Sequence, residues 1–344
     1  MMERMLITGP GFCCCVENGL LTEYIQEDAS QQYGDIVGGR VERLMPGIGC
    51  AFVNIGRKKD GFLPLDEMSR SFEGEKLKSG VFIPVQIRKE ETGNKGAFLT
   101  RDLTLAGRTV LLMPLNRHIG ISSRITDEEE RKRLRETGEE IADGETGLVL
   151  RTAAREAGTE KIAEEVRSLA EEWQRIREQI RTGFKAGEVL FHQDPVKQMI
   201  RDYESMGIQG RKETEALSAE MQRQLRESES RMVRIPNGGN IVIDRCEAMT
   251  VIDVNSASSG IKGKPEASYT EINLAACETI AAQIRLRNLA GIIMIDFIDM
   301  KEEADRQKVA EKLAEVMKRD RRKTVIHGWT RLGIMEMTRK RTGG

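Results

Sequence analysis

Two short apolar segments, each ending near an aspartate, constrain the fold of this chain more than any other feature. Residues 249–255 contain Asp253, and residues 291–297 contain Asp296. Apolar residues occupy both alternating faces of each segment, which predicts two strands buried within a sheet rather than lying on its surface. The helical pattern between the segments indicates that a helix connects the two strands.

These aspartates and a nearby asparagine form an all-oxygen ligand set. A carboxylate at the end of a buried strand needs a cation, hydrogen-bond donors or water, because an isolated buried charge is prohibitively costly. Asn255 lies two residues from Asp253, so both side chains project from the same face of the strand. This set suits a hard cation such as Mg²⁺ and not zinc. From the residues alone, the alternative that either aspartate caps a helix or pairs with an arginine stays open.

The sequence around the two aspartates carries a family resemblance. Residues 273–289, then Gly291 and the segment 295–300, together with the spacing from Asp-x-Asn to the second Asp, resemble the catalytic core of the bacterial ribonuclease E/G family. The resemblance covers nearly the whole chain and is weakest at residues 1–30 and 204–232.

The resemblance implies a magnesium-dependent endoribonuclease that cuts single-stranded RNA during rRNA and mRNA processing and decay. Asp253 and Asp296 would bind Mg²⁺, with Mn²⁺ as a substitute, and Asn255 would orient them or a metal-bound water. Hydrolysis would then leave a 5′-phosphate and a 3′-hydroxyl. Arg285 and Arg287 would hold the RNA backbone, with exposed helix charges as the alternative for both.

A non-catalytic RNA-binding protein built on the same modules is the alternative function. The intact set of Asp253, Asn255 and Asp296 favours catalysis, because a protein that only binds RNA would have no reason to keep it. A zinc enzyme lacks ligands, since no C-x-x-C pair and no histidine at ligand spacing accompany the cysteines. We expect reduced thiols at all six of them: Cys13, Cys14, Cys15, Cys50, Cys246 and Cys277.

Length and charge are consistent with several modules. At 344 residues with 39% hydrophobic content, the chain can bury more than one core. The net charge of −1 gives no nucleic-acid signal, but residues 301–344 contain 13 basic and 7 acidic side chains. A basic end beside a carboxylate site is what a phosphodiester substrate would need. No segment has the apolar length of a membrane span or the layout of a signal peptide, so we expect a soluble, cytoplasmic protein.

Residues 35–106 predict an all-β module. Five short alternating runs, separated by glycine and proline turns, resemble the S1 domain, an oligonucleotide-binding barrel. The resemblance places Phe52, Phe62 and Lys95 where S1 domains of this family contact RNA. Periodicity alone slightly favours core positions for the two phenylalanines.

Residues 107–188 predict strands that alternate with helices, including a long amphipathic helix over about 159–181. The resemblance implies that Arg151 and Thr152, at the end of a strand, help to form a pocket for the 5′-monophosphate of RNA. It also implies that the turn beginning at Gly120 faces the terminal nucleotide. Without the resemblance, Arg151 reads as an ordinary surface arginine.

The expected fold class is α+β with several domains, and the resemblance supplies their names. Only one charged helix, at roughly 212–232, stands where the family carries a longer segment. The C-terminal end lacks the family's C-P-x-C zinc link, so we expect no zinc and at most a homodimer without such a link. The predicted domains are a reduced ribonuclease-H-like subdomain (1–34 plus 189–232), an inserted S1/OB-type β-barrel (35–106), a 5′-sensor-like α/β region (107–188) and a deoxyribonuclease-I-like α/β catalytic domain (233–344).

Overall fold

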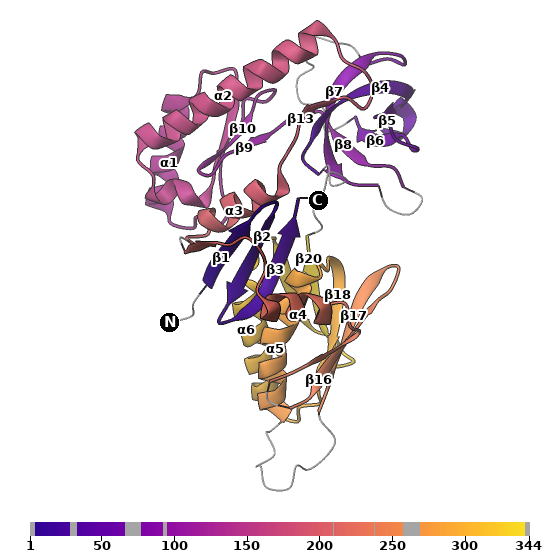
Figure 1. Cartoon of the computed structure of the whole chain (residues 1–344), viewed down its shortest axis with the longest axis vertical. Helices are drawn as coiled ribbons and strands as arrows, with labels where there is room; N and C mark the ends of the chain where they lie inside the picture. Colours follow the sequence, from indigo (N-terminus) through magenta and orange to yellow (C-terminus); the bar gives the residue numbers. More distant parts are fainter. Residues whose placement is uncertain are drawn as a thin grey trace. The chain divides into compact units, whose positions relative to one another are not determined.

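The fold comprises two compact units (Figure 1). One unit combines residues 1–26 with 209–341, and the other spans 27–208 together with 342–344. No helix in the described part of the chain is long and apolar enough to cross a membrane. The four predicted domain boundaries stay predictions. The computed structural model describes residues 4–27, 33–65, 77–91, 95–208, 210–236, 238–256 and 269–340.

A closed β-barrel forms the first part of the unit spanning residues 27–208. Its strands follow the order β4-β5-β6-β8-β7, and pairing between β4 and β7 closes the barrel. The five-stranded barrel expected from the sequence is therefore confirmed. Its core consists of aliphatic side chains from the alternating inward positions. The elements are β4 (Ile36–Met45), the 3₁₀ helix η1 (Pro46–Ile48), β5 (Cys50–Asn54), β6 (Gly61–Pro64), β7 (Phe82–Lys89) and β8 (Phe98–Thr100).

A glycine is required where β6 and β8 approach each other. A Cβ atom at Gly96 would lie 2.0 Å from the carbonyl oxygen of Asp60. Any side chain there would push the backbone of the two segments apart. This explains the Gly96 that follows Lys95 in the barrel.

The remainder of this unit is an α/β layer, as predicted. A sheet in the order β11-β12-β10-β9 packs against two helices through a shared apolar core. The Asp127 side chain accepts a 2.8 Å hydrogen bond from the Glu130 amide and begins the first helix, which carries acidic residues in its first turn. The elements are β9 (Leu105–Ala106), β10 (Val110–Met113), β11 (Ile119–Ile121), α1 (Glu128–Ile141), β12 (Gly147–Leu150), the 3₁₀ helix η3 (Thr152–Glu156), α2 (Thr159–Thr182) and α3 (Pro195–Ser205). Strand β13 (Val189–Phe191) instead pairs with β4 of the barrel.

The other unit contains a six-stranded sheet in the order β15-β16-β17-β18-β20-β19. Strands β17 and β18 are parallel, and every other pair of neighbours is antiparallel. The connection between the parallel strands contains a helix, as the sequence predicted. The elements are β15 (Met232–Arg234), β16 (Asn240–Arg245), β17 (Met249–Asn255), α5 (Tyr269–Leu286), β18 (Gly291–Asp296), α6 (Glu303–Met317), β19 (Thr324–Trp329) and β20 (Met335–Arg339).

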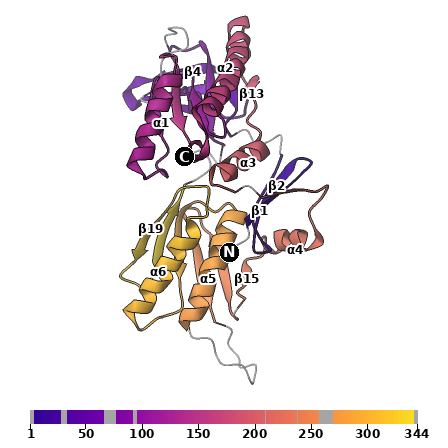
Figure 2. The same ribbon diagram turned by 90° about the vertical axis from the view of Figure 1, so that its left-hand side faces the viewer.

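Only one face of this sheet is covered within the described part of the unit. Helices α5 and α6 lie side by side on that face (Figure 2), where they bury Ile252 and Ile295. On the other face Met249 is 37% exposed and Ile292 is 46% exposed. The prediction that both strands are buried on both sides is therefore wrong. Apolar residues at alternating positions could not reveal that both helices pack on the same side.

A second, smaller sheet joins the two sequence segments of this unit. The order is β14-β1-β2-β3, in which β14 pairs in parallel with β1. Cys13, Cys14 and Cys15 lie buried on β2 without disulfides, and burial raises the pKa of Cys13 and Cys14 to about 12. These thiols are packing residues rather than nucleophiles. The elements are β1 (Arg4–Gly9), β2 (Phe12–Glu17), β3 (Leu20–Gln26), β14 (Arg211–Glu213) and α4 (Ala219–Glu227).

The segment expected as one charged helix over 212–232 has a different structure. Its first residues form β14, and helix α4 begins only after Ser218, whose side chain accepts a hydrogen bond from the Met221 amide. Leu217, Met221 and Leu225 then pack against the small sheet. Edge pairing with β1 competes successfully with helix formation at the start of this segment, a tertiary effect that local sequence does not indicate.

One buried carboxylate connects the small sheet to helix α5. Glu17 on β2 is 5% exposed and accepts hydrogen bonds of 2.6 and 2.9 Å from Arg285, which is 3% exposed. Arg4 lies 2.8 Å from the same carboxylate, and Arg319 lies 3.8 Å from it. Burial alone would raise the pKa of Glu17, but the hydrogen bonds and charges of these arginines lower it.

We expect Glu17→Leu to reduce the free energy of unfolding by about 3–5 kcal/mol, because it removes the anion shared by buried cations. Urea titration measures this loss. Because the folded pKa of Glu17 is lowered, its stabilisation is present above the ordinary carboxyl range and is lost as the pH falls through the lowered folded pKa. The control is Asp244→Ala, which breaks an exposed pair with Arg231 and should leave the urea midpoint nearly unchanged. Equal losses in the two variants would contradict the central role of Glu17.

Candidate functional site

Two aspartates face each other across the parallel strands of the six-stranded sheet. Asp253 on β17 is the register partner of Asp296 on β18, and both side chains are exposed on the face without helices. Neighbouring strands lie roughly 4.8 Å apart, so the two carboxylates are close. Asn255 donates a 2.8 Å hydrogen bond from Nδ2 to Oδ2 of Asp253. The structure thus brings together the three residues that the sequence singled out.

The electrostatics of this pair favour a cation. Partial burial raises the pKa of Asp296, and the negative charges of Asp253 and Asp299 raise it further. Among the described residues, no group of three or more His, Cys, Asp and Glu side chains could hold a metal ion. Two carboxylates with water as the remaining ligands suit Mg²⁺, which seldom occupies a cage made entirely of protein ligands. Asp253 and Asp296 therefore fit a hard divalent cation at the carboxyl ends of β17 and β18.

A buried asparagine positions the segment that follows Asp296. Asn273 on α5 is fully buried, donates a 2.8 Å hydrogen bond to the Ile298 carbonyl and accepts a 3.1 Å bond from the Ile298 amide. Strand β18 ends at Asp296, so these two hydrogen bonds hold the backbone just beyond the end of the strand. Sequence analysis assigned no role to Asn273, although a polar side chain inside an apolar helix was a usable signal.

The predicted RNA-contacting residues of the barrel lie on its surface. Phe52 and Phe62 are register partners on β5 and β6, and their ring centroids lie 6.2 Å apart in an edge-to-face arrangement. Both rings are half-buried and stand outside the buried barrel core, and Lys95 is exposed. The alternative that the two phenylalanines are core residues is therefore wrong. RNA contact by these residues stays a prediction.

The two arginines expected to hold the RNA backbone have different environments. Arg285 is buried against Glu17, which contradicts both RNA contact and the alternative of an exposed helix charge. Its partner lies 268 positions away in the sequence, so no local pattern indicates the pair. Arg287 is half-buried and donates a 2.7 Å hydrogen bond to Gln283, and its RNA contact stays a prediction.

The predicted 5′-phosphate residues cluster at the end of the α/β sheet. Gly120 pairs with Val149, next to the strand end that carries Arg151 and Thr152. The hydroxyl oxygens of Ser122 and Thr152 lie 3.3 Å apart. The structure therefore brings Gly120 and Thr152 into one region.

The Arg151 guanidinium already has anionic and carbonyl partners in this structure. It pairs with Asp202 on α3 and donates a 2.5 Å hydrogen bond to the Gly107 carbonyl. Burial lowers the pKa of Arg201, and the positive charge of Arg151 lowers it further. A phosphate at Arg151 would compete with Asp202 for the guanidinium. The sequence did not indicate this competition.

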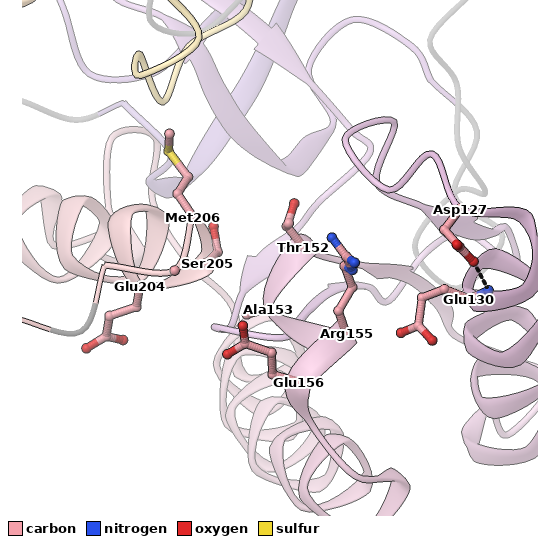
Figure 3. A pocket seen from close by; sticks show the side chains of 10 residues that line it. Asp127, Glu130, Thr152, Ala153, Arg155, Glu156, Glu204, Ser205 and Met206 are labelled. Carbon is pink, nitrogen blue, oxygen red and sulfur yellow. Dashed lines mark hydrogen bonds between the residues drawn. The ribbon is translucent and has the colours of Figure 1, made fainter. Parts of the chain in front are cut away.

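A cavity of about 490 Å³ lies next to Thr152 (Figure 3). Thr152 and Arg155 project into it, with the Arg155 guanidinium lying between Thr152 and Glu130. Its lining carries one cation and several carboxylates. The excess of negative charge disfavours binding of an anionic ligand in this cavity. The lining residues are Asp127, Glu130, Thr152, Ala153, Arg155, Glu156, Glu204, Ser205, Met206 and Gly207.

Comparison with known families agrees with the architecture. Residues 30–102 match the S1 RNA binding domain, which makes the barrel an S1 domain. Residues 104–211 and 209–342 match the Ribonuclease E/G family and together include the small sheet's β14, the α/β layer and the opposed aspartates. The chain belongs to the ribonuclease E/G family.

Curated relatives give the same result over most of the sequence. Ribonuclease G of Escherichia coli strain K12 is 31% identical over 375 residues, covering 95% of this chain and 77% of the relative. Ribonuclease G of Haemophilus influenzae is 33% identical, covering 95% and 76%. Ribonuclease E of the Synechocystis strain PCC 6803 is 33% identical, covering 94% of this chain and 54% of the relative.

We expect millimolar magnesium to raise the melting temperature of the protein, because a cation between Asp253 and Asp296 relieves their repulsion. In EDTA, Asp296→Asn should itself stabilise the protein by less than about 1 kcal/mol, since exposed charges are well screened. The same variant should lose most of the gain from magnesium in calorimetry. Glu336→Gln, at an exposed position of β20 on the same sheet face, should keep that gain. An equal magnesium effect in Asp296→Asn would place the cation elsewhere.

Proposed function

We propose that this protein is a magnesium-dependent endoribonuclease that cuts single-stranded RNA. The observation that carries the proposal is the register pairing of Asp253 with Asp296, with Asn255 bonded to Asp253, in a member of the ribonuclease E/G family. The S1 match and the names of the ribonuclease G and ribonuclease E relatives support RNA as the ligand.

The chemistry follows from the two carboxylates. Asp253 and Asp296 would hold the cation, and Asn255 would keep the Asp253 carboxylate in its orientation through the 2.8 Å hydrogen bond. When bound, Mg²⁺ would lower the pKa of a water and neutralise charge on the scissile phosphate. Attack of that water on phosphorus, with cleavage of the P–O3′ bond and protonation of the departing 3′-oxygen, would leave a 5′-phosphate and a 3′-hydroxyl. Asn273 would act indirectly by fixing the backbone just after Asp296.

The finer architecture belongs to the same proposal. The six-stranded sheet with α5 and α6 would be the deoxyribonuclease-I-like catalytic domain, and the α/β layer would be the 5′-sensor-like region. The small sheet, with β14 supplied by the shortened segment, would be part of the reduced ribonuclease-H-like subdomain. Assembly would reach at most a homodimer without a zinc link.

We expect Asp253→Ala and Asp296→Ala each to cut a short single-stranded RNA at least roughly a hundredfold more slowly, because each removes half of the carboxylate ligands. RNA affinity should survive, since it depends on the barrel and on phosphate contacts. Gel-based cleavage with magnesium and anisotropy in EDTA measure the two properties separately.

Glu336→Ala is the matched control for these two variants, because it removes a carboxylate from the same sheet face outside the pair. It should cut RNA at the parental rate. Normal cutting by both aspartate variants would place the active site elsewhere. A parent protein that binds RNA but cuts it with no divalent ion would instead favour the non-catalytic alternative.

The proposal includes a preference for the 5′ end of RNA. Gly120, Arg151 and Thr152 would bind a 5′-monophosphate, with the phosphate replacing Asp202 at the Arg151 guanidinium. A charge-assisted hydrogen bond contributes about 1.5–3 kcal/mol, so exchange of one anion for another leaves only the difference between them. The preference should therefore be modest in the parent protein.

We expect RNA with a 5′-monophosphate to be cut faster than the same RNA with a 5′-hydroxyl, and Arg151→Ala to abolish the difference. Asp202→Asn should enlarge it, because the neutral side chain competes less with phosphate. Arg117→Ala, at an exposed pair with Glu145 in the same layer, should change nothing. Equal rates on the two RNAs in the parent would refute the 5′-phosphate site while leaving the metal site unaffected.

A further inference from the structure

One row of side chains crosses all five strands of the S1 barrel. Each member is the register partner of the next, so the row is continuous across the five strands. Three rings occupy its middle, and one cation stands at each end. In spatial order the members are Arg43 on β4, Phe52 on β5, Phe62 on β6, Phe98 on β8 and Lys89 on β7.

The distances along the row are regular. The ring centroids of Phe52 and Phe62 lie 6.2 Å apart, and those of Phe62 and Phe98 lie 5.7 Å apart with planes tilted by 32°. The guanidinium carbon of Arg43 is 5.4 Å from the Phe52 centroid, and the Lys89 ammonium is 5.3 Å from the Phe98 centroid. Both cations are exposed.

None of the three rings is needed to fill the barrel. The buried core is formed by aliphatic side chains, and Phe52, Phe62 and Phe98 are all half-buried outside it. Rings that stay partly in water beside cations offer π faces to bases and positive charge to phosphates. The row is therefore complementary to an unpaired nucleic-acid strand in both its apolar and its charged parts.

We propose that Phe98 is a third base-stacking residue, so that the row binds three successive unpaired bases of RNA. Arg43 and Lys89 would then contact the phosphates that flank those bases. This inference rests on the proposed RNA-binding function and extends the site formed by Phe52, Phe62 and Lys95. Because every base has a π face, such a row selects unpaired RNA without selecting its sequence.

The test measures binding of the full chain to a fluorescent hexa-adenylate RNA by anisotropy in EDTA, which stops metal-dependent cutting. Phe98→Leu should raise Kd by about fivefold or more, the effect of losing one stacked base. Phe98→Tyr should bind like the parent, since it keeps the ring. If Phe98 only packs against the barrel, Phe98→Leu should bind RNA as tightly as the parent. That result would overturn the proposal.

Phe82→Leu is the matched control for this experiment. Phe82 is a 42% exposed phenylalanine on β7 of the same barrel, and its ring faces Phe184 at 6.2 Å rather than the row. Its substitution should leave RNA affinity unchanged. A loss equal to that of Phe98→Leu would mean that any exposed ring on the barrel contributes, which would overturn the defined row.

The cations at the two ends provide an independent measurement. Arg43→Gln and Lys89→Gln should each reduce the slope of log K against log salt concentration by about 0.7, the value for one phosphate contact on a single strand. Unchanged slopes in both variants would show that Arg43 and Lys89 do not contact phosphates of the RNA.

Failure of this inference differs from failure of the proposed function. A parent protein that does not bind the RNA at all would refute RNA binding itself. If the parent binds, and Phe52→Leu and Phe62→Leu weaken binding while Phe98→Leu does not, RNA binding stands and the three-base row is wrong.

Discussion

Parallel pairing between β17 and β18 sets the chemistry of one unit, because it places Asp253 and Asp296 at the same level of the sheet. Parallel neighbours require a crossover connection, and α5 lies within it and buries its apolar side chains on the sheet. Asn273 on that helix also holds the segment after β18 through two hydrogen bonds to Ile298. One helix thus supports the parallel pair, fills the core and fixes the backbone beside the opposed carboxylates.

Carboxylates serve opposite purposes in different parts of this unit. Glu17 is buried, and the arginines around it lower its pKa, so its charge stabilises the fold. Asp296 is exposed opposite another aspartate, and partial burial followed by like charge raises its pKa. Because both carboxylates are exposed on the open face, water screens their mutual repulsion. Arginines of the protein itself neutralise Glu17, whereas the proposed catalytic pair of Asp253 and Asp296 would be neutralised by a bound cation.

The unit spanning residues 27–208 would offer the two proposed kinds of RNA contact, which differ in selectivity. The aromatic row of the barrel would recognise any unpaired strand, because stacking is insensitive to base identity. The Arg151 site would recognise one terminal phosphate, but Asp202 already occupies the guanidinium. The acidic cavity next to Thr152 further limits how much negative charge that region accepts. The aromatic row would therefore supply affinity for RNA, and the Arg151 site would separately discriminate between 5′ ends.

Much of this architecture could be predicted from the sequence because its signals are local. Glycine and proline turns delimited the barrel strands, helical periodicity identified α2 and α5, and spacing with family resemblance singled out Asp253, Asn255 and Asp296. Only the tertiary structure decided which face of β17 is covered, that Arg285 is buried against Glu17, that Asp202 pairs with Arg151, and that Phe98 completes an aromatic row. These features depend on side chains 51 to 268 positions apart or on non-local strand register, such as Phe62 beside Phe98. Periodicity within one segment specifies which residues share a face, but only packing determines what that face meets.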